Sequence, residues 1–153
     1  AKRAIDYVYY PPVGNRGVGL YRAQGYGTNF ENYKEKAQND LIIIAQIEHY
    51  KGVENLEEII SLNHIDGIII GPYDLSGSLG IPGNFSNKTF LTHIEKVEKV
   101  CRKHNFPLGY HQVHPNHQQL QEKIDHGYRF LGFGTDFLFM SEKINKELAR
   151  IKK

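Results

Sequence analysis

The sequence contains few of the residues and patterns on which several classes of protein depend. A single cysteine, Cys101, among 153 residues excludes an internal disulfide framework and is typical of a reducing compartment. No apolar run approaches the length of a membrane span, and the first ten residues hold no unbroken apolar stretch like that of a secretory signal. We therefore expect a cytoplasmic protein with no membrane partner.

An excess of charge of one sign is also missing. The 19 basic and 17 acidic side chains give a formal net charge of +2, and they are interspersed along the chain. Nucleic-acid-binding domains usually carry a basic stripe, so no nucleic-acid partner is expected. The hydrophobic share of 40% is enough for a core, and the length fits a single domain over residues 1–153.

The sequence does contain a regular alternation of short apolar runs and amphipathic segments. Strands are predicted over residues 40–48, 66–72, 106–112 and 128–136, the first of them buried on both faces. Helices are predicted over residues 52–63, 87–105, 116–127 and 141–153, with Gly127 capping the third and Ser141 beginning the fourth. Four repeats of strand and helix predict an α/β fold with a parallel sheet.

Residues 9–27 interrupt this pattern with two prolines and five glycines, and they are expected to form a long irregular loop. Loops of this length inside a compact domain are often functional. Arg16 in this loop has two possible roles, which the residues alone leave open. It could hold a carboxylate or stabilise an enolate, or it could form a surface ion pair.

Acidic side chains follow two of the predicted strands at their carboxyl ends, where parallel sheets bind ligands. Glu48 follows the first strand and Asp74 the second. Neighbouring strands lie roughly 4.8 Å apart, so two such carboxylates repel unless a cation or proton lies between them. Mg²⁺ takes a few carboxylates and fills its other positions with water or substrate oxygens. Spacing alone favours the alternative, in which each acid caps a helix or pairs with a lysine.

Other patterns of catalytic chemistry are weaker. His111, His114 and His117 lie within seven residues, but they straddle a proline and a strand end, so their rings need not converge on zinc. His111 remains a candidate pocket-lining residue. Ser76 and Ser78 follow no nucleophile-elbow pattern, and the glycines do not form a dinucleotide-binding fingerprint.

Three stretches together are more specific: YPPVGNRGVG at 10–19, IIIAQIEHYKGVENLEEI at 42–59 and IDGIIIGPYDLSGSLGIPG at 65–83. In order and spacing they resemble the metal-dependent pyruvate aldolases of the HpcH/HpaI family, which includes the 2-dehydro-3-deoxyglucarate and 4-hydroxy-2-oxo acid aldolases. The resemblance implies a (β/α)8 barrel of the TIM type, of which this chain holds about the last four βα units. It also implies a carbon–carbon lyase that reversibly cleaves 2-keto-4-hydroxy acids to pyruvate and an aldehyde.

Carried over by motif position, the resemblance implies that Glu48 and Asp74 are the two protein ligands of a divalent metal. Mg²⁺ is expected, with Mn²⁺ and Co²⁺ as alternatives. Gln46 and Tyr73 would bind the pyruvate-type keto acid, Tyr73 through its backbone N–H. Family members commonly form trimers or hexamers with the last helix swapped, so a homo-oligomer is expected, with residues 141–153 as the candidate swapped helix.

The chain also departs from the family pattern. The family's catalytic histidine and arginine belong to the first half of the barrel, so the catalytic base is expected upstream of this chain, and Arg16 is not that arginine. A fragment is expected rather than a natural half-barrel, because an open half-barrel exposes unpaired strand edges. The alternative function is a non-catalytic or split relative that binds a keto acid or metal, or acts as a partner subunit. Citryl-CoA lyase chemistry would need a nucleotide-binding surface, which the sequence does not indicate.

Overall fold

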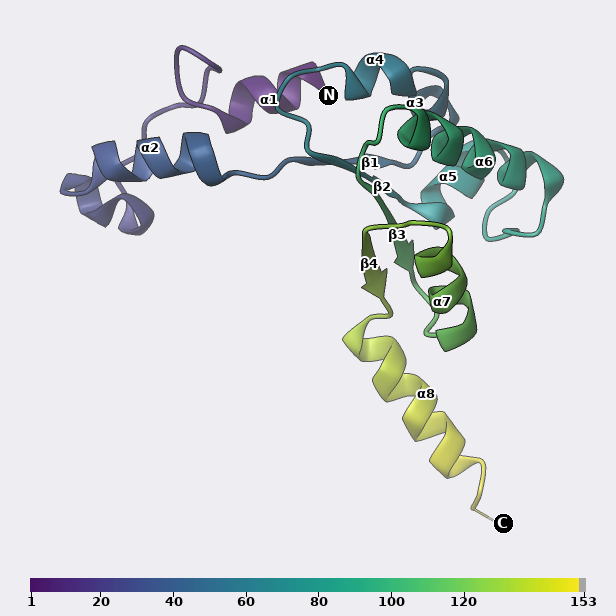
Figure 1. The fold of residues 1–153 in the computed structure, drawn as a ribbon. Coiled ribbons are helices and arrows are strands. Elements are labelled where there is room, and N and C mark those ends of the chain that lie inside the picture. Colours follow the sequence, from purple (N-terminus) through teal and green to yellow (C-terminus); the bar gives the residue numbers. More distant parts are fainter. Residues whose placement is uncertain (152–153) are drawn as a thin grey trace.

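The protein is built on one parallel sheet, seen in a computed structural model that describes residues 1–151 (Figure 1). The strands lie side by side in sequence order: β1 (Ile44–Ile47), β2 (Gly67–Ile70), β3 (Leu108–Gln112) and β4 (Phe130–Phe133). Every neighbouring pair is parallel, so the carboxyl ends of all four strands lie along one edge of the sheet. The predicted α/β class with a parallel sheet is confirmed.

Each strand is followed by helix, which gives four consecutive βα units. These helices are α3 (Tyr50–Glu54) and α4 (Leu56–Ile60), α5 (Pro72–Ser78) and α6 (Lys88–Lys103), α7 (His117–Asp125), and α8 (Asp136–Leu148). Before β1 lie α1 (Lys2–Val8), the 3-10 helix η1 (Arg22–Gly27) and α2 (Phe30–Asp40). None of the helices in the described part of the chain combines the length and apolar character needed to cross a bilayer.

Several predicted boundaries differ from the structure. The loop over residues 9–27 is irregular only as far as η1, which forms its last six residues. The predicted helix over 52–63 is two short helices that meet at Asn55. Thr135, rather than Ser141, is the N-cap of α8, because the chain turns at Gly134 with a φ of 67° and becomes helical directly afterwards. Gly127 does follow the end of α7, with a φ of 87° that favours glycine.

α5 occupies a segment for which no helix is predicted. Its sequence, PYDLSGS, begins with proline, contains glycine and shows no helical period of apolar residues. Pro72 suits the first turn, because an N–H there would have no partner within the helix. Leu75 and Ser76 are completely buried, so tertiary packing stabilises a helix whose local sequence does not favour it.

The two faces of the sheet have different surroundings. On one face, Ile47, Ile70 and Tyr110 stand side by side in register and are buried beneath the helices. On the other face, Ile44 is 44% exposed and Gln46 is also exposed. The prediction that the first strand is buried on both faces is therefore wrong for residues 1–151, because the helices that follow the strands cover one face only.

α6 supplies much of the packing on the covered face. Phe90, Ile94, Val97 and Cys101 recur at helical spacing and are all buried. Burial raises the pKa of the Cys101 thiol to about 11. Leu91, which the same pattern places in the core, is 45% exposed instead.

Tyr128 connects β4 to α6 beneath the covered face. Its hydroxyl donates a 2.7 Å hydrogen bond to the carboxylate of Glu98, and its ring packs edge-on against Tyr110 with centroids 5.9 Å apart. Tyr128 is 5% exposed. Burial, followed by the hydrogen bond and charge of Glu98, raises the pKa of Tyr128 far above its ordinary value.

The Tyr128→Phe variant tests this contact. Removing the hydroxyl leaves Glu98 without its partner and should lower the free energy of unfolding by about 2 kcal/mol near neutral pH. The raised pKa also makes the wild type lose stability as the pH rises above about 10, because the unfolded chain then ionises first. Urea unfolding at about pH 8 and about pH 11 should show a smaller loss in the variant. An equally steep loss in both proteins would contradict this role.

Candidate active site at the carboxyl ends of β1 and β2

The parallel register of β1 and β2 places two acidic residues at the same edge of the sheet. Ile47 and Ile70 pair at the ends of the two strands. Glu48 follows β1 directly, and Asp74 is the third residue of α5, which begins two residues after β2. Both carboxylate side chains line one open hollow of about 540 Å³.

A close contact between Gly71 and the end of β1 shapes this edge. Gln46 donates a 2.7 Å hydrogen bond from Nε2 to the Glu48 carboxylate. A Cβ atom at Gly71 would lie 2.8 Å from that Nε2 and 3.3 Å from the Glu48 Cβ. Glycine therefore lets the backbone at the start of α5 approach the Gln46–Glu48 pair. In the sequence, only the position of Gly71 between a strand and a proline could have indicated that the backbone approaches another segment closely here.

The charges of the two acids are not neutralised by basic side chains. Within residues 1–151, neither Glu48 nor Asp74 forms a salt bridge, and neither caps a helix through its side chain. His49 caps α3 instead, by accepting a hydrogen bond from the Lys51 N–H. Within residues 1–151, Glu48 and Asp74 therefore neither cap a helix nor pair with a lysine, which was the alternative role.

The donor set at this edge suits a hard cation. Two carboxylates that face one open hollow would repel each other without a positive charge, and Mg²⁺ prefers oxygen ligands. The described residues contain no group of three or more histidine, cysteine or acidic side chains placed to hold a metal. A cation here would therefore use two protein carboxylates and complete its coordination with water or substrate oxygens.

Two buried or partly buried serines hold α5 in place. Ser76, which is completely buried, donates to the Tyr73 carbonyl at 2.8 Å and accepts from the Gly83 N–H at 2.9 Å. Ser78 accepts a 3.0 Å hydrogen bond from the Tyr50 N–H at the start of α3. The sequence indicated no nucleophilic role for either serine; in the structure Ser76 holds α5 against Gly83, and Ser78, the last residue of α5, holds it against the start of α3.

Tyr73 lines the hollow, and its side chain points toward the loop after β3. Its hydroxyl lies 2.9 Å from His114 Nε2, and its ring packs edge-on against Phe85. Its backbone N–H belongs to the first turn of α5, where N–H groups have no partner within the helix. His111 lies on the Gln46 face of the sheet, where a Cβ at Gly132 would be 3.0 Å from its ring.

Arg16 has a structural partner that the sequence did not indicate. Its guanidinium stacks on the ring of Tyr10 at 4.7 Å and donates a 3.2 Å hydrogen bond to the Tyr33 hydroxyl. Among residues 1–151 it forms no ion pair and does not line the hollow beside Glu48. Of the two roles that the sequence left open for Arg16, the surface ion pair is not formed within residues 1–151.

Comparisons with known proteins agree with this arrangement. Residues 1–142 match the sequence profile described as HpcH/HpaI aldolase/citrate lyase. A 2-keto-3-deoxy-L-rhamnonate aldolase of Escherichia coli O6:K15:H31 is 33% identical over 154 residues, which cover 99% of this chain and 57% of that enzyme. The chain thus spans little more than half the length of the curated relatives that it matches.

Solved structures show the same fold. The HpcH/HpaI aldolase of Desulfitobacterium hafniense superposes with a TM-score of 0.82 at 25% identity, over 99% of this chain and 59% of that one. A family protein from Burkholderia cenocepacia superposes with a TM-score of 0.87 at 23% identity, over 98% of this chain and 59% of that one. The four βα units are therefore part of the expected (β/α)8 architecture, and this chain belongs to the HpcH/HpaI aldolase/citrate lyase family.

Proposed function

We propose that this chain forms the metal- and keto-acid-binding part of a class II aldolase that reversibly cleaves 2-keto-4-hydroxy acids to pyruvate and an aldehyde. The observation that carries the proposal is the pair of unneutralised carboxylates, Glu48 and Asp74, on adjacent βα junctions beside one hollow. The E. coli relatives named as 2-keto-3-deoxy-L-rhamnonate aldolases support it. Because the chain spans 57% of their length, the activity of the whole protein is part of the proposal.

In this proposal Glu48 and Asp74 hold a divalent cation, Mg²⁺ in the first instance and Mn²⁺ or Co²⁺ as alternatives. When bound, the cation supplies positive charge beside the negative charge that develops as the carbon–carbon bond breaks. Gln46 keeps the Glu48 carboxylate in one orientation through its 2.7 Å hydrogen bond. The buried Ser76 holds the helix turn that carries Asp74 in place through its hydrogen bonds to the Tyr73 carbonyl and the Gly83 N–H.

The keto acid would bind at the same edge. The Tyr73 N–H, in the first turn of α5, is available to donate to the carboxylate of pyruvate. Gln46, which lies on the open face of the sheet, would contact the substrate beside the cation. We assign no general base in this chain, in keeping with the expectation that the family's histidine belongs to a preceding segment.

The alternative function is that of a relative that binds a keto acid without cleaving it. A measurement of turnover distinguishes it from an aldolase. A pyruvate-release assay with 2-keto-4-hydroxy acids, with Mg²⁺ added, would detect the enzyme. Because we assign no general base to this chain, slow release of pyruvate agrees with the aldolase proposal, whereas binding of Mg²⁺ and pyruvate with no release at all would favour the non-catalytic alternative. Binding and turnover therefore need to be measured on the same protein preparation.

Oligomer formation is part of the same proposal. Figure 1 shows α8 extending away from the sheet. Four apolar residues form a stripe along this helix, and each is more than half exposed: Phe137, Met140, Ile144 and Leu148. Such a stripe requires a partner surface. We propose that a second copy of the chain covers it, with residues 141–151 of the expected swapped helix at the interface; residues 152–153 lie outside the described part.

The Asp74→Asn variant tests the metal site. The substitution removes one of two negative charges, so Mg²⁺ and Mg²⁺-dependent pyruvate binding should weaken by at least about tenfold, measured by isothermal titration calorimetry. The fold should be retained, because the Asp74 side chain makes no hydrogen bond in residues 1–151. Asp40→Asn, on the exposed end of α2, is the matched control. Unchanged Mg²⁺ affinity in Asp74→Asn would overturn the assignment.

The Gly71→Ala variant tests the approach of α5 to β1. The added methyl group meets Gln46 Nε2 at 2.8 Å, so Gln46 must move and Glu48 loses its orienting hydrogen bond. Mg²⁺ affinity should fall by about three- to tenfold, a smaller effect than removal of a ligand charge. Gly17→Ala is the control, because a Cβ there meets nothing within 4 Å. Equal affinities for both variants would show that this contact does not shape the site.

The Ile144→Asp variant tests the covering of α8. A carboxylate in the centre of the apolar stripe should shift the protein toward monomer in sedimentation velocity, since burial of a charge at an interface is costly. Asn145→Asp adds the same charge one residue away from the stripe and should leave the assembly unchanged. A wild-type protein that sediments as a monomer at every concentration tested would contradict the proposed assembly.

A further inference from the structure

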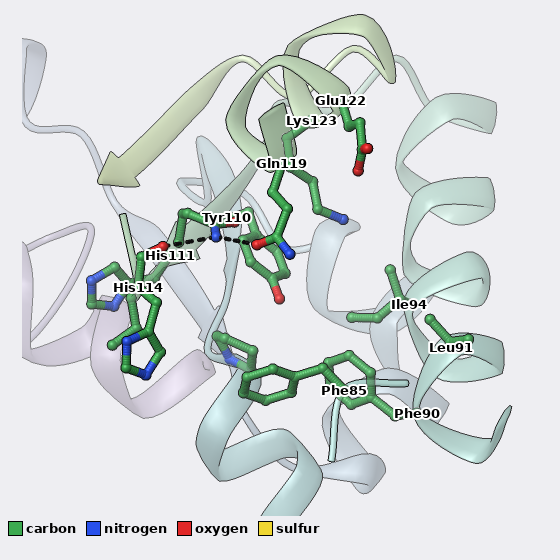
Figure 2. A pocket seen from close by; sticks show the side chains of 13 residues that line it. Phe85, Phe90, Leu91, Ile94, Tyr110, His111, His114, Gln119, Glu122 and Lys123 are labelled. Atoms are coloured by element: carbon green, nitrogen blue, oxygen red, sulfur yellow. Dashed lines mark hydrogen bonds between the residues drawn. The ribbon is translucent and has the colours of Figure 1, made fainter. Parts of the chain in front are cut away.

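A second cavity, of about 370 Å³, lies on the helix-covered face of the sheet, opposite the face that carries Gln46. Figure 2 shows it between α6 and α7, above the ring of Phe85. One wall is apolar and consists of Phe85, Phe90, Leu91 and Ile94. The partial exposure of Leu91 noted above places this side chain at the cavity rather than in the core.

The opposite wall presents hydrogen-bond donors to the same space. Lys123 and Gln119 come from α7 and Tyr110 from β3, and all three line the cavity. In Figure 2 the ammonium group of Lys123 and the hydroxyl of Tyr110 both point into it. The arrangement brings together groups from two elements that are joined by residues 113–116.

These donors have no acceptor within residues 1–151. Gln112 donates to the side-chain oxygen of Gln119 at 2.7 Å and to the His114 carbonyl at 2.9 Å, which leaves the Gln119 amide nitrogen free. Neither the Lys123 ammonium nor the Tyr110 hydroxyl has a hydrogen-bond partner or an ion pair in this part of the chain. The three groups are therefore free to donate to an anionic ligand that enters the cavity.

Lys123 lies close to two aromatic rings and has no ion pair within residues 1–151, although Glu122 also lines the cavity. Its ammonium lies 4.6 Å from the centroid of the Tyr110 ring and 4.8 Å from that of Tyr128. Burial lowers the pKa of Lys123, and the carboxylates of Glu98 and Glu122 act in the opposite direction. Glu98 already accepts a hydrogen bond from Tyr128. A negative ligand at the ammonium would offset the cost of its burial.

We propose that this cavity binds a small organic monocarboxylate with an apolar ring or short chain. The carboxylate would accept hydrogen bonds from Lys123, Gln119 and Tyr110, and the apolar part would pack against Phe90, Leu91 and its neighbours. The volume lies at the lower end of the range of about 300–1,000 Å³ for small-molecule sites. The site does not depend on the proposed aldolase chemistry, since Glu48 and Asp74 line a different hollow.

The test is a titration of ¹⁵N-labelled protein with benzoate and with the neutral analogue benzyl alcohol, followed by NMR. Benzoate should shift the side-chain amide resonances of Gln119 in a saturable manner, and benzyl alcohol should bind at least about tenfold more weakly because it cannot pair with the ammonium. Equal affinities for benzoate and benzyl alcohol, or no saturable shift at Gln119, would overturn the proposal.

The Lys123→Met variant tests whether the ammonium group anchors the carboxylate. Lys123→Met keeps the length of the side chain over the tyrosine rings and should weaken benzoate binding by at least about tenfold. Lys99→Met, on the exposed side of α6, is the matched control and should bind like the wild type. Unweakened binding to Lys123→Met would show that the ammonium is not the anchor.

A second variant is independent of the charge. Leu91→Trp enlarges a partly exposed residue at the cavity and should abolish benzoate binding by filling the space, while the unfolding temperature stays close to that of the wild type. Unchanged benzoate binding to Leu91→Trp would refute the location. Asp74→Asn should bind benzoate normally, so that failure of the metal site and failure of this cavity can be distinguished.

Discussion

The parallel pairing of β1 with β2 is the constraint on which the candidate site depends. It fixes Ile47 opposite Ile70, so the residues that follow both strands must emerge at one edge. Gly71 then lets α5 begin within van der Waals distance of the Gln46–Glu48 pair. Neither acid has to be brought into position by a flexible loop, because Glu48 directly follows a strand and Asp74 lies in the first turn of α5.

The alternation of side chains along each strand gives the sheet two faces of different character. Gln46 and Glu48 share the direction of the open face, whereas Ile47 lies between them and points to the helices. In β3, Tyr110 faces the helices and His111 the open side. A single sheet therefore carries a polar edge on one side and an apolar layer with its own cavity on the other.

The sequence predicted the features that arise from local pattern. Isoleucine-rich runs identified β1 and β2, and the parallel order of the predicted strands placed Glu48 and Asp74 at one edge of the sheet, where the structure has them. It failed where tertiary contacts override local preference: α5 is a helix because Leu75 and Ser76 are buried. The cavity between α6 and α7 was also beyond prediction, because its residues come from separate elements and show no periodicity that relates them to one another.

The burial of Cys101 makes the single thiol an internal probe of motion. It is 2% exposed on the face of α6 that packs against the sheet, and its raised pKa keeps it protonated near neutral pH. A thiol-reactive reagent modifies it mainly in conformations in which the packing of α6 on the strands loosens, since the reagent needs access to the thiolate. The rate of labelling therefore measures how often this layer opens in the native protein, without any engineered cysteine.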